Sequence, residues 1–597
     1  MSPSNSRPYW LAAGRSGFLA ALLVGAATLM TTPAHAAGGR SKLDRQLQAV
    51  VDAGGPPQRV IVQTAPGAGS DVAKAQGKKG RRADSVGTQS DLLTLTAPTS
   101  ELAALAERPD VVRISSDAPV QSHTTADVAA PTAGHVIGTL GLANSPWNGS
   151  WVGVAVIDSG VAFSKDFRWA NNFWDFTLTD ASGAPLPPAQ SKTSDDYGHG
   201  THVAGLIANN DNFAEGVYRG IAPSVSLYPM KVLDRTGTGR TSNVIRAIDF
   251  AVANKDSMWI DVINLSLGHP ILEPAASDPL VQAVERAVRA GIVVVVSAGN
   301  IGRNAQTGQV GYAGITSPGN APSAITVGAV DTRQTLARGD DIVPAFSSRG
   351  PTWYDGLAKP DIVAPGVQLV STVSSSSTLY QKSPYLLTDT ITGGTDSTVY
   401  MRFSGTSMAA AVTTGVVAQM IQANRETWGN GPWQTGGQTA PPLTPNAIKA
   451  ILQYTALDVT GADRLTQGAG ALNGEGAVRL AAAIDTRAPV GEPWVLGSVV
   501  PTSTIDEEAW LWSQTLIWGD SLVWGDSIFS NRLAWGLSLV WGDSLIWGDS
   551  LVWGDSLVWG DGLIWGESLV WGESLVWGDS LIWGESLVWK DPPPTQP

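Results

Sequence analysis

The chain has 597 residues, of which 43% are hydrophobic, and it carries a formal net charge of −14. This length exceeds an ordinary single domain and the apolar content is ample for a large core, so we expect several separable segments. The absence of cysteine excludes disulfides, zinc–thiolate sites and a cysteine nucleophile, and it leaves six histidines as candidate bases or metal ligands.

Acidic residues are concentrated at the C-terminal end. Residues 501–597 carry 14 acidic and 2 basic residues, whereas residues 1–120 carry 9 acidic and 13 basic residues. A negatively charged segment is repelled by the phosphate groups of nucleic acids and of anionic membranes. We therefore expect neither an anionic membrane surface nor a nucleic acid as its partner.

Residues 1–36 have the pattern of a signal peptide. Arg7 and Arg15 precede an apolar run at 17–30, and the small residues Ala34 and Ala36 follow where a signal peptidase would cut. A membrane anchor is the alternative, but a run of 14 residues is short for a span. The two arginines are not adjacent, as a twin-arginine signal would require. We predict a secreted or cell-surface protein that is exported by a Sec-type signal.

Residues 37–120 form a small unit with its own pattern of elements. One capped helix that ends before Pro109 is predicted, together with three strands, at 59–64, 91–97 and 111–117. The basic stretch KKGRRAD is predicted to be a solvated loop, with a processing site as the alternative. No residue of this unit indicates chemistry by itself.

The first candidate catalytic residue is Asp158. It ends the continuous apolar run of WVGVAVIDSG, which predicts a buried strand. Open α/β sheets place their sites at the carboxyl ends of such strands. An aspartate that only caps a following helix is the alternative at this point.

The second candidate is His199, which lies between two glycines in DDYGHGTHVAGLIA, ahead of an apolar helical run. Glycine lets backbone or substrate approach the imidazole closely. His199 and His202 lie three residues apart and could instead bind a metal, but the HExxH arrangement is absent and no histidine cluster completes a shell. We predict that His199 is a general base and that His202 is a buried structural histidine.

The third candidate is Ser407 in MRFSGTSMAAAVTTGVVAQM. Gly405 and Thr406 predict a turn, and an Ala/Val-rich helix follows at once. A hydroxyl at a helix N-terminus lies where amides and the helix dipole favour developing negative charge. Serine needs a neutral imidazole and an orienting carboxylate to act as a nucleophile, and His199 and Asp158 supply them.

Three segments, DSG, GHGTHVAG and GTSMA, in the order Asp, His, Ser, resemble the signature blocks of the subtilisin-like serine proteases, also called subtilases or peptidase family S8. Six further segments resemble the same fold in sequence order, namely MKVLDRTGTGRTSNVIRAIDFAV, VINLSLG, VVVVSAGN, ITVGAVD, FSSRGP and KPDIVAPG. The resemblance runs from about Trp151 to about Ile484. It implies an α/β fold, an open parallel sheet with helices on both faces, in a peptidase domain that we assign to residues 121–485. It also implies a serine endopeptidase of class EC 3.4.21 whose chemistry needs no cofactor.

The resemblance implies further site residues. Asn300 matches the asparagine that stabilises the oxyanion of the tetrahedral intermediate. The residues that match the walls of the peptide-binding cleft and its first specificity pocket are Gly237, Thr238, Gly239, Ser266, Leu267, Gly268, Ala298 and Gly299. Backbone pairing along such walls suits extended protein or peptide substrates. Ala411 and Val412 stand where the family usually has proline and histidine, so we expect altered packing of that helix without loss of chemistry.

A structural calcium ion is an open expectation. Four residues resemble the calcium-binding loops of the family, namely Asp166, Asn209, Asn210 and Asp211. Oxygen ligands suit calcium, but surface turns rich in Asn and Asp are common, and the spacing departs from the family pattern. Both interpretations stay open from the sequence.

The resemblance also implies a role for residues 37–120. A unit of strand, strand, helix and strand ahead of a subtilisin-like domain resembles the prosegment of the family, an intramolecular inhibitor and folding assistant that the enzyme cuts from itself. We expect the cut between about Ser116 and Thr125, where the pattern of elements ends.

The last part of the chain repeats a hexapeptide of the form S/G, Leu, Val/Ile, Trp, Gly, Asp/Glu. We assign a linker to residues 486–504 and a β-type repeat tail to residues 505–597. A period of six is a multiple of two and not of 3.6, so it favours strands over a helix. Two forms are open, a stacked solenoid and short antiparallel strands joined by two-residue turns.

The repeat has no triad, metal motif or phosphate loop. Four roles stay open for it: binding to a surface, self-association, stabilisation of the protease, and a sorting tail that is processed. Deleting residues 505–597 is expected to spare hydrolysis of a small peptide. Two functions are weighed for the whole chain. One is a secreted, self-processing serine endopeptidase. The other is an adhesive or self-assembling surface protein that acts through the repeat and carries a catalytically relict protease domain. The intact candidate residues favour the first.

Overall fold

The computed structural model describes the chain from the end of the predicted signal peptide into the first repeat units. The described residues are 39–123, 135–162, 164, 166–167, 173–191, 194–210, 217–304, 306–393, 396–429, 440–489, 492–497, 499–518 and 521–524. The signal peptide and most copies of the repeat lie outside them. No helix in these ranges is long and apolar enough to cross a membrane.

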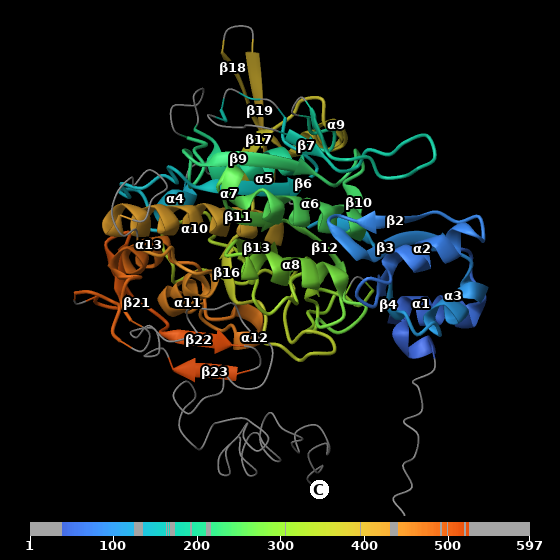
Figure 1. The fold of residues 1–597 in the computed structure, drawn as a ribbon. Helices are drawn as coiled ribbons and strands as arrows, with labels where there is room; N and C mark the ends of the chain where they lie inside the picture. Colours follow the sequence, from blue (N-terminus) through green and yellow to red (C-terminus); the bar gives the residue numbers. More distant parts are fainter. Residues whose placement is uncertain are drawn as a thin grey trace, which may run out of the picture.

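An eight-stranded sheet forms the centre of the larger unit (Figure 1). Its strands lie in the order β16 (Ile362–Pro365), β15 (Ile325–Val330), β13 (Val293–Ser297), β11 (Ile260–Leu265), β6 (Gly153–Asp158), β9 (Ser226–Lys231), β7 (Phe173–Asp175) and β8 (Ala189–Ser191). Neighbouring strands are parallel, except that β7 and β8 are antiparallel. Strands such as VVVVS of β13 are buried along their whole length because both faces of the sheet are covered.

Helices pack on both faces of this sheet. On one face lie α5 (His199–Ala208), α10 (Thr406–Trp428), α11 (Pro445–Thr455) and α13 (Gly474–Ala483), which contribute to the largest hydrophobic core. On the other lie α6 (Thr241–Ala253) and α8 (Pro279–Arg289), whose apolar residues form a second core with the sheet. This arrangement confirms the predicted α/β class with helices on both faces.

The remaining elements of the larger unit are short. The helices are α4 (His135–Thr139), α7 (Lys255–Met258), α9 (Thr378–Lys382), η2 (Pro384–Leu386) and α12 (Arg464–Gln467). A separate sheet joins β10 (Thr238–Arg240), β5 (Pro119–Ser122), β12 (Leu267–Pro270) and β14 (Thr316–Ser317), in that order. A third sheet joins β17 (Leu369–Val373), β19 (Asp396–Phe403) and β18 (Leu387–Gly393).

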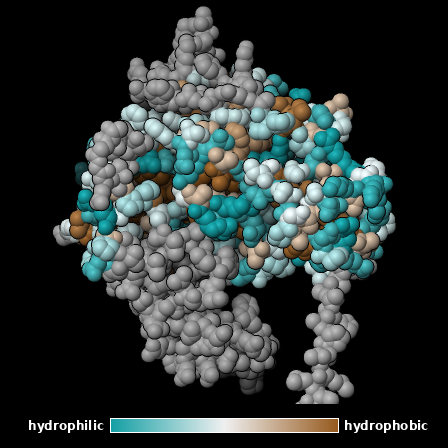
Figure 2. All heavy atoms as spheres, in the orientation of Figure 1, coloured by the Kyte–Doolittle hydropathy of each residue, from teal (hydrophilic) through white to brown (hydrophobic). Residues whose placement is uncertain are grey.

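The N-terminal unit is a four-stranded antiparallel sheet with helices and a core of its own. Its elements are η1 (Gly39–Lys42), α1 (Arg45–Ala53), β1 (Gln58–Thr64), α2 (Gly69–Gly77), β2 (Ala83–Val86), β3 (Gln89–Ala97), α3 (Thr99–Ala106) and β4 (Val111–Ser116). The strands lie in the order β2-β3-β1-β4. Its face in Figure 2, on the right, is mostly hydrophilic because its apolar side chains are turned inward.

Two helices and one strand of this unit were not predicted from the sequence. The strands β1, β3 and β4 and the helix α3 lie where the pattern placed them, whereas α1, α2 and β2 were missed. The strand β2 begins in the last two residues of the stretch taken as a basic loop. The arginines ahead of it are ion-paired, Arg81 with Glu101 and Arg82 with Asp84. These pairs show why a charged stretch could still form ordered structure.

The segment assigned as a linker packs against the larger unit. Trp494 of this segment is buried in the largest core, and so are Ile505, Trp512 and Leu516 beyond it. The indole Nε1 of Trp512 donates a hydrogen bond to Ser503 Oγ at 2.9 Å. The described residues of 486–504 therefore belong to the folded unit and do not extend away from it, because apolar side chains within a Pro/Gly/Thr-rich stretch find partners in the core.

Short hairpins follow this segment. Strand β20 (Thr502–Ile505) pairs with β21 (Glu508–Leu511), and β22 (Thr515–Trp518) pairs with β23 (Ser521–Trp524), both antiparallel. In the second hairpin Leu516 is the partner of Val523, and Trp518 is the partner of Ser521. These two hexapeptide units therefore take the antiparallel form of the two that the sequence left open; later units lie outside the described residues.

Candidate active site

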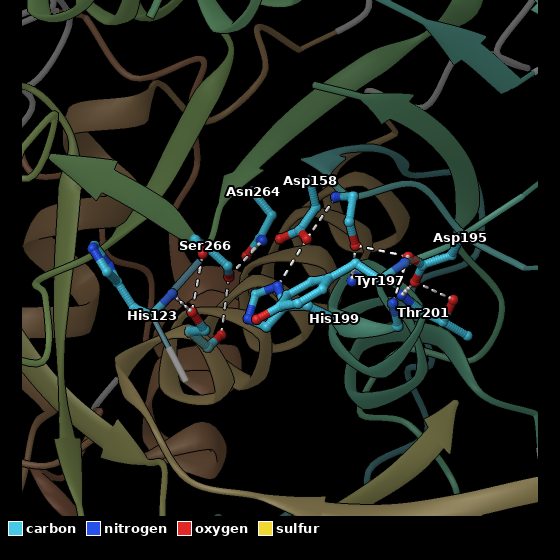
Figure 3. A network of polar contacts seen from close by, with 12 residues as sticks. His123, Asp158, Asp195, Tyr197, His199, Thr201, Asn264 and Ser266 are labelled. Carbon is cyan, nitrogen blue, oxygen red and sulfur yellow. Dashed lines mark hydrogen bonds and ion pairs between the residues drawn. The ribbon is translucent and has the colours of Figure 1, made fainter. Parts of the chain in front are cut away.

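Asp158 and His199 lie side by side in the interior of the larger unit (Figure 3). Asp158 ends β6 and His199 begins α5, and both side chains are fully buried. The Nδ1 atom of His199 lies 2.7 Å from Oδ1 of Asp158, so the carboxylate fixes the orientation of the ring. The Nε2 atom of His199 is buried and has no hydrogen-bond partner among the described residues, so it is open to a proton donor.

A buried aspartate holds the start of α5 in place. Asp195 accepts hydrogen bonds from the backbone N–H groups of Gly198 (2.7 Å) and Thr201 (2.8 Å) and from the hydroxyls of Thr201 (2.6 Å) and Ser159 (2.8 Å). It thus links the first turn of the helix that carries the histidine to the residue after Asp158. Sequence reasoning missed Asp195; the signal was an aspartate just ahead of a predicted helix, where carboxylates cap N-termini.

Glycine lets the helix α5 begin next to the end of β6. Gly198 has φ 103°, a left-handed backbone that favours glycine. A Cβ atom added to Gly200 would collide with the backbone oxygen of Gly160 and lie 3.2 Å from Cβ of Asp158. The two glycines around His199 therefore serve close packing of the histidine against the aspartate.

Ser407 is the second residue of α10 and is fully buried. Its Oγ donates a hydrogen bond to the backbone oxygen of Ser266 at 3.0 Å and accepts one from the backbone N–H of His123 at 3.2 Å. Ser266 Oγ in turn donates to the backbone oxygen of Ser407 at 3.0 Å (Figure 3). The hydroxyl is thus held between Ser266, which precedes β12, and His123.

Asn300 lies beside the same helix terminus. Its Oδ1 atom accepts hydrogen bonds from the backbone N–H and the hydroxyl of Thr406, both at 3.0 Å. This contact fixes the amide so that Nδ2 is the free donor, and Nδ2 is buried without a partner among the described residues. A Cβ on Gly405 would lie 3.0 Å from Nδ2 and would collide with the backbone oxygen of His123, so both atoms lie against Gly405. Sequence reasoning missed Thr406 as the residue that orients this amide.

The two predicted walls of the cleft flank a segment of the chain itself. The strand β5 lies between β10 and β12 and is antiparallel to both. Gln121 is the partner of Thr238 on one side and of Gly268 on the other, and Ser122 is the partner of Leu267. The predicted wall residues are therefore brought together around residues 119–122 by backbone pairing.

The predicted specificity pocket lies beyond Ser122. Ala298 and Gly299 follow β13, and the backbone N–H of Gly299 donates to Thr406 Oγ1 at 3.1 Å, next to Asn300. The side chain of His123 extends to the end of β13, where its Nδ1 atom lies 2.8 Å from Ser297 Oγ. Ser297 was not singled out from the sequence, although it directly precedes the two predicted pocket residues.

The calcium candidates are only partly gathered. The backbone N–H of Asn210 donates to the backbone oxygen of Asp166 at 2.9 Å, but Asp166 Oδ2 already accepts from the hydroxyl of Tyr400 at 3.1 Å. Asn209 is buried nearby, and Asp211 lies outside the described residues. No group of three His, Asp or Glu side chains suited to a metal occurs in the part of the chain that the structure describes. Because Asp211 lies outside the described residues, calcium binding at this loop stays a prediction.

His202 is a buried structural residue, as predicted. Its Nε2 atom lies 3.1 Å from the backbone oxygens of Leu369 and Met401, and its ring packs against Phe403 with the ring centroids 4.4 Å apart. Burial, with a smaller contribution from the nearby His199, lowers the pKa of His202 to about 3. The ring is therefore neutral, and it ties α5 to the sheet of β17 and β19.

An Asp–His pair at the carboxyl end of a parallel sheet, with a serine at the start of the neighbouring helix, is the arrangement used by hydrolases with a Ser-His-Asp triad. Comparison with known families gives the same class. The model of the Subtilase family matches residues 149–477, which is more than half of the chain. The chain belongs to the subtilase family, as the sequence motifs predicted.

Several curated proteins are similar to this chain. Serine protease AprX of Bacillus subtilis is 36% identical over 337 residues, which are 55% of this chain and 66% of that protein. Subtilisin E of the same species is 37% identical over 290 residues, 48% of this chain and 60% of that protein. Subtilisin DY of Bacillus licheniformis is 32% identical over 333 residues, 56% of this chain and 93% of that protein. The match to AprX and subtilisin E thus spans about two thirds or less of those proteins.

A solved structure supports the same fold. Fervidolysin from Fervidobacterium pennivorans, described as a keratinolytic enzyme related to subtilisin, aligns with a TM-score of 0.52 at 23% identity. The alignment covers 71% of this chain and 61% of that protein. At this identity the likeness concerns the fold alone.

Proposed function

We propose that the chain is the precursor of a secreted serine endopeptidase that hydrolyses peptide bonds of proteins through an acyl-enzyme on Ser407. The observation that carries this proposal is the position of β5, which lies between the two walls of the cleft as a peptide substrate would and brings His123 to Ser407. Two further features support it, namely the buried Asp158–His199 pair and the amide Nδ2 of Asn300, which has no partner among the described residues.

In the proposed reaction Ser407 Oγ attacks the carbonyl carbon of the peptide while His199 Nε2 takes its proton. Asp158 holds the ring through Nδ1 and stabilises the imidazolium that forms. When the C–N bond breaks, His199 returns the proton to the leaving amine, and an ester remains on Ser407. Water then attacks this ester with His199 again as the base, which releases the acid and restores the serine. The reaction uses only these side chains and water.

The oxyanion of the tetrahedral intermediate would be stabilised by Asn300 Nδ2 and the backbone amide at the start of α10. The support is geometric, because the free amide and the carbonyl oxygen of His123 both lie against Gly405. Thr406 holds Asn300 from the other side, so the donor is oriented before negative charge appears.

Replacing Asn300 by alanine is expected to lower kcat for a peptide substrate by a factor of about 10² to 10³, a magnitude carried over from subtilisin, a relative of this chain. KM should change little because the charge on the oxygen develops only in the transition state. Steady-state kinetics on the mature enzyme would measure both. Asn254→Ala, at the far end of α6, is the matched control, and a raised KM with unchanged kcat for Asn300→Ala would contradict the assignment.

We further propose that residues 37–120 are an inhibitory prosegment that the enzyme removes by itself. Besides β5 in the cleft, two polar contacts support docking of this unit. Asp117 accepts hydrogen bonds from the backbone N–H and the hydroxyl of Ser242 at the start of α6, both at 2.9 Å. Arg113 pairs with Glu273 at 2.7 Å. The unit thereby blocks the cleft until it is cut and released.

The proposed cut lies between His123 and Thr124, within the range expected from the sequence. His123 is the residue whose N–H reaches Ser407 Oγ and whose carbonyl oxygen lies against Gly405 beside Asn300. Mass spectrometry of secreted protein should find a mature N-terminus at Thr124. The Ser407→Ala precursor, purified alone, should remain uncut, and its maturation at this bond without another protease would contradict self-processing.

Covalent labelling tests the function as a whole. A fluorophosphonate probe should label processed protein at Ser407, and the same material should hydrolyse casein. Labelling should be absent in Ser407→Ala and retained in Ser257→Ala, an exposed serine of α7, just ahead of the amino end of β11. Absence of both labelling and hydrolysis in correctly processed protein would reject the protease and favour the relict adhesive protein.

For the later repeat units we propose an interaction role, either binding to a surface or association between copies of the chain. The support is compositional, since each repeat unit combines Leu, Val or Ile and Trp with one acidic residue and has no catalytic motif. Sedimentation of the full chain against a chain that ends at residue 524 would distinguish the two, because only self-association changes the mass of the full chain in the absence of a surface.

A further inference from the structure

The pocket that receives the His123 side chain has a polar group at its base. Ser297 ends β13 and is fully buried, and its Oγ lies 2.8 Å from Nδ1 of His123. A Cβ on Gly268 would lie 2.9 Å from Cε1 of His123, so the imidazole passes closely over the backbone of β12. The pocket therefore holds the ring by a hydrogen bond at one edge and by backbone contact along its face.

The hydroxyl of Ser297 has few other partners. Its other described contact is to the backbone oxygen of Leu265, at the long distance of 3.5 Å. A ligand that fills this pocket without a polar atom at the position of Nδ1 would leave a buried hydroxyl poorly satisfied, which costs more than a lost exposed hydrogen bond. An imidazole nitrogen at this position can form a hydrogen bond with the hydroxyl in either tautomer of the ring, because the hydroxyl can donate or accept.

The charges around the ring favour neutral imidazole. The titratable groups that face His123 are His199 on α5, which is paired with Asp158, and His269 on β12; β13 contributes the uncharged Ser297 and α10 the uncharged Ser407. Burial, with a smaller contribution from the nearby His199 and His269, lowers the pKa of His123 to about 3. No carboxylate contacts the ring among the described residues, so nothing compensates a proton on it.

On the basis of the proposed function, we propose that Ser297 is a specificity-determining residue that makes this protease cleave after histidine in its neutral form. The same pocket would serve the first cut, after His123, and later cuts in other proteins, once β5 has left the cleft. Ser297 would act through a hydrogen bond to the substrate ring and would take no part in the proton transfers at His199.

The test uses the mature enzyme and a matched pair of fluorogenic peptides, Pro-Val-Gln-Ser-His and Pro-Val-Gln-Ser-Leu, each joined through its last carbonyl to aminomethylcoumarin. The measured quantity is the ratio of kcat/KM for the His peptide to that for the Leu peptide. We expect a ratio of about 10 at pH 8, and we expect Ser297→Ala to lower it by about 5- to 30-fold, the range for one buried hydrogen bond. Ser257→Ala should leave the ratio unchanged.

The pH dependence of the ratio tests the protonation state. Both peptides depend equally on the candidate catalytic residues, so only the substrate side chain differs between them. Free histidine has a pKa of about 6.5 and the bound ring a lower one. Binding of the His peptide is therefore fully favoured above about pH 6.5 and weakens below it, because a proton must first be removed. The ratio should fall by up to about tenfold per pH unit below that value.

Three outcomes separate this inference from the proposed function. If the probe labels Ser407 and both peptides are cut, but Ser297→Ala leaves the ratio unchanged, the role of Ser297 is refuted and the protease stands. A ratio that rises toward low pH would likewise refute selection of the neutral ring. If neither labelling nor hydrolysis occurs, the proposed function fails, and the inference fails with it.

Discussion

Replacing His199 by alanine, in protein whose prosegment has been cut by an added protease, is expected to lower kcat by a factor on the order of 10⁶, as much as replacing Ser407. This magnitude is carried over from the triad of subtilisin, where removing either residue costs about as much as removing the whole triad. The physical reason is that Ser407 cannot lose its proton without Nε2 of His199, and the oxyanion donors then have little charge to stabilise. Steady-state kinetics and the rate of fluorophosphonate labelling would measure the loss.

The neighbouring histidine offers a matched control. His202 lies one turn further along α5, is equally buried, and bonds only to backbone oxygens of Leu369 and Met401. His202→Ala should lower the free energy of unfolding by about 2–5 kcal/mol through a cavity and two lost contacts. The folded fraction of this variant should still be labelled by the probe. A His199→Ala enzyme that retained more than 1% of wild-type kcat would contradict the role of His199 as the base.

Deleting residues 505–597 is expected to prevent stable folding, in contrast to the expectation drawn from the sequence. The deletion removes Ile505, Trp512, Leu516 and Ile517, all buried in the largest core. Burial of one such side chain contributes about 1.5–3 kcal/mol, so the four together are comparable with the whole net stability of a domain, about 5–15 kcal/mol. Thermal unfolding and soluble yield would measure the effect.

Polar contacts add to this loss. The side chain of Gln453 on α11 pairs with the backbone of Ile517 in both directions, with its Nε2 donating to the oxygen and its Oε1 accepting from the N–H, each at 3.1 Å. Deletion would leave this buried amide without those partners, which costs further free energy. The first repeat unit is therefore held to α11 by hydrogen bonds as well as by apolar packing.

The matched deletion is residues 525–597, which keeps both hairpins. It should leave Tm within about 3 °C of the full chain and should leave hydrolysis of the peptide substrates unchanged, because the described core is intact. The point variant Trp512→Ala in the full chain should cost about 3–5 kcal/mol. If the chain that ends at residue 504 unfolded at the same temperature as the chain that ends at residue 524, the packing of this segment would have no energetic importance.

The candidate site could be proposed from the sequence because each of its main residues is marked by its immediate neighbours. Asp158 ends an unbroken apolar run, His199 stands between glycines, and Ser407 follows a Gly-Thr turn into a helix. Local constraints of this kind are visible in a sequence. Asp195 was missed because an aspartate before a helix has many uses, and only the fold shows that its oxygens reach Gly198, Thr201 and Ser159 together.

The C-terminal boundary could not be predicted for a different reason. Composition marked residues 486–504 as a linker and the hexapeptide repeat as a separate tail. Whether Trp512 and Leu516 pack on the preceding domain depends on an apolar surface formed by α11 and α13, more than twenty residues upstream. No periodicity within the repeat carries that information, since the buried and the later copies have nearly the same sequence.

The sequence by itself determined the fold class, the family and the order of the three candidate catalytic residues. Apolar runs, glycine positions and helix starts each depend on a few neighbouring residues, so they can be recognised without the fold. Only the tertiary structure decided which segment lies in the cleft and whether the first repeat units pack against the preceding domain. The placement of β5 between β10 and β12, the meeting of His123 with Ser297, and the burial of Trp512 each join residues that are far apart in the chain. Such contacts depend on how whole elements pack, which a pattern within one segment does not record.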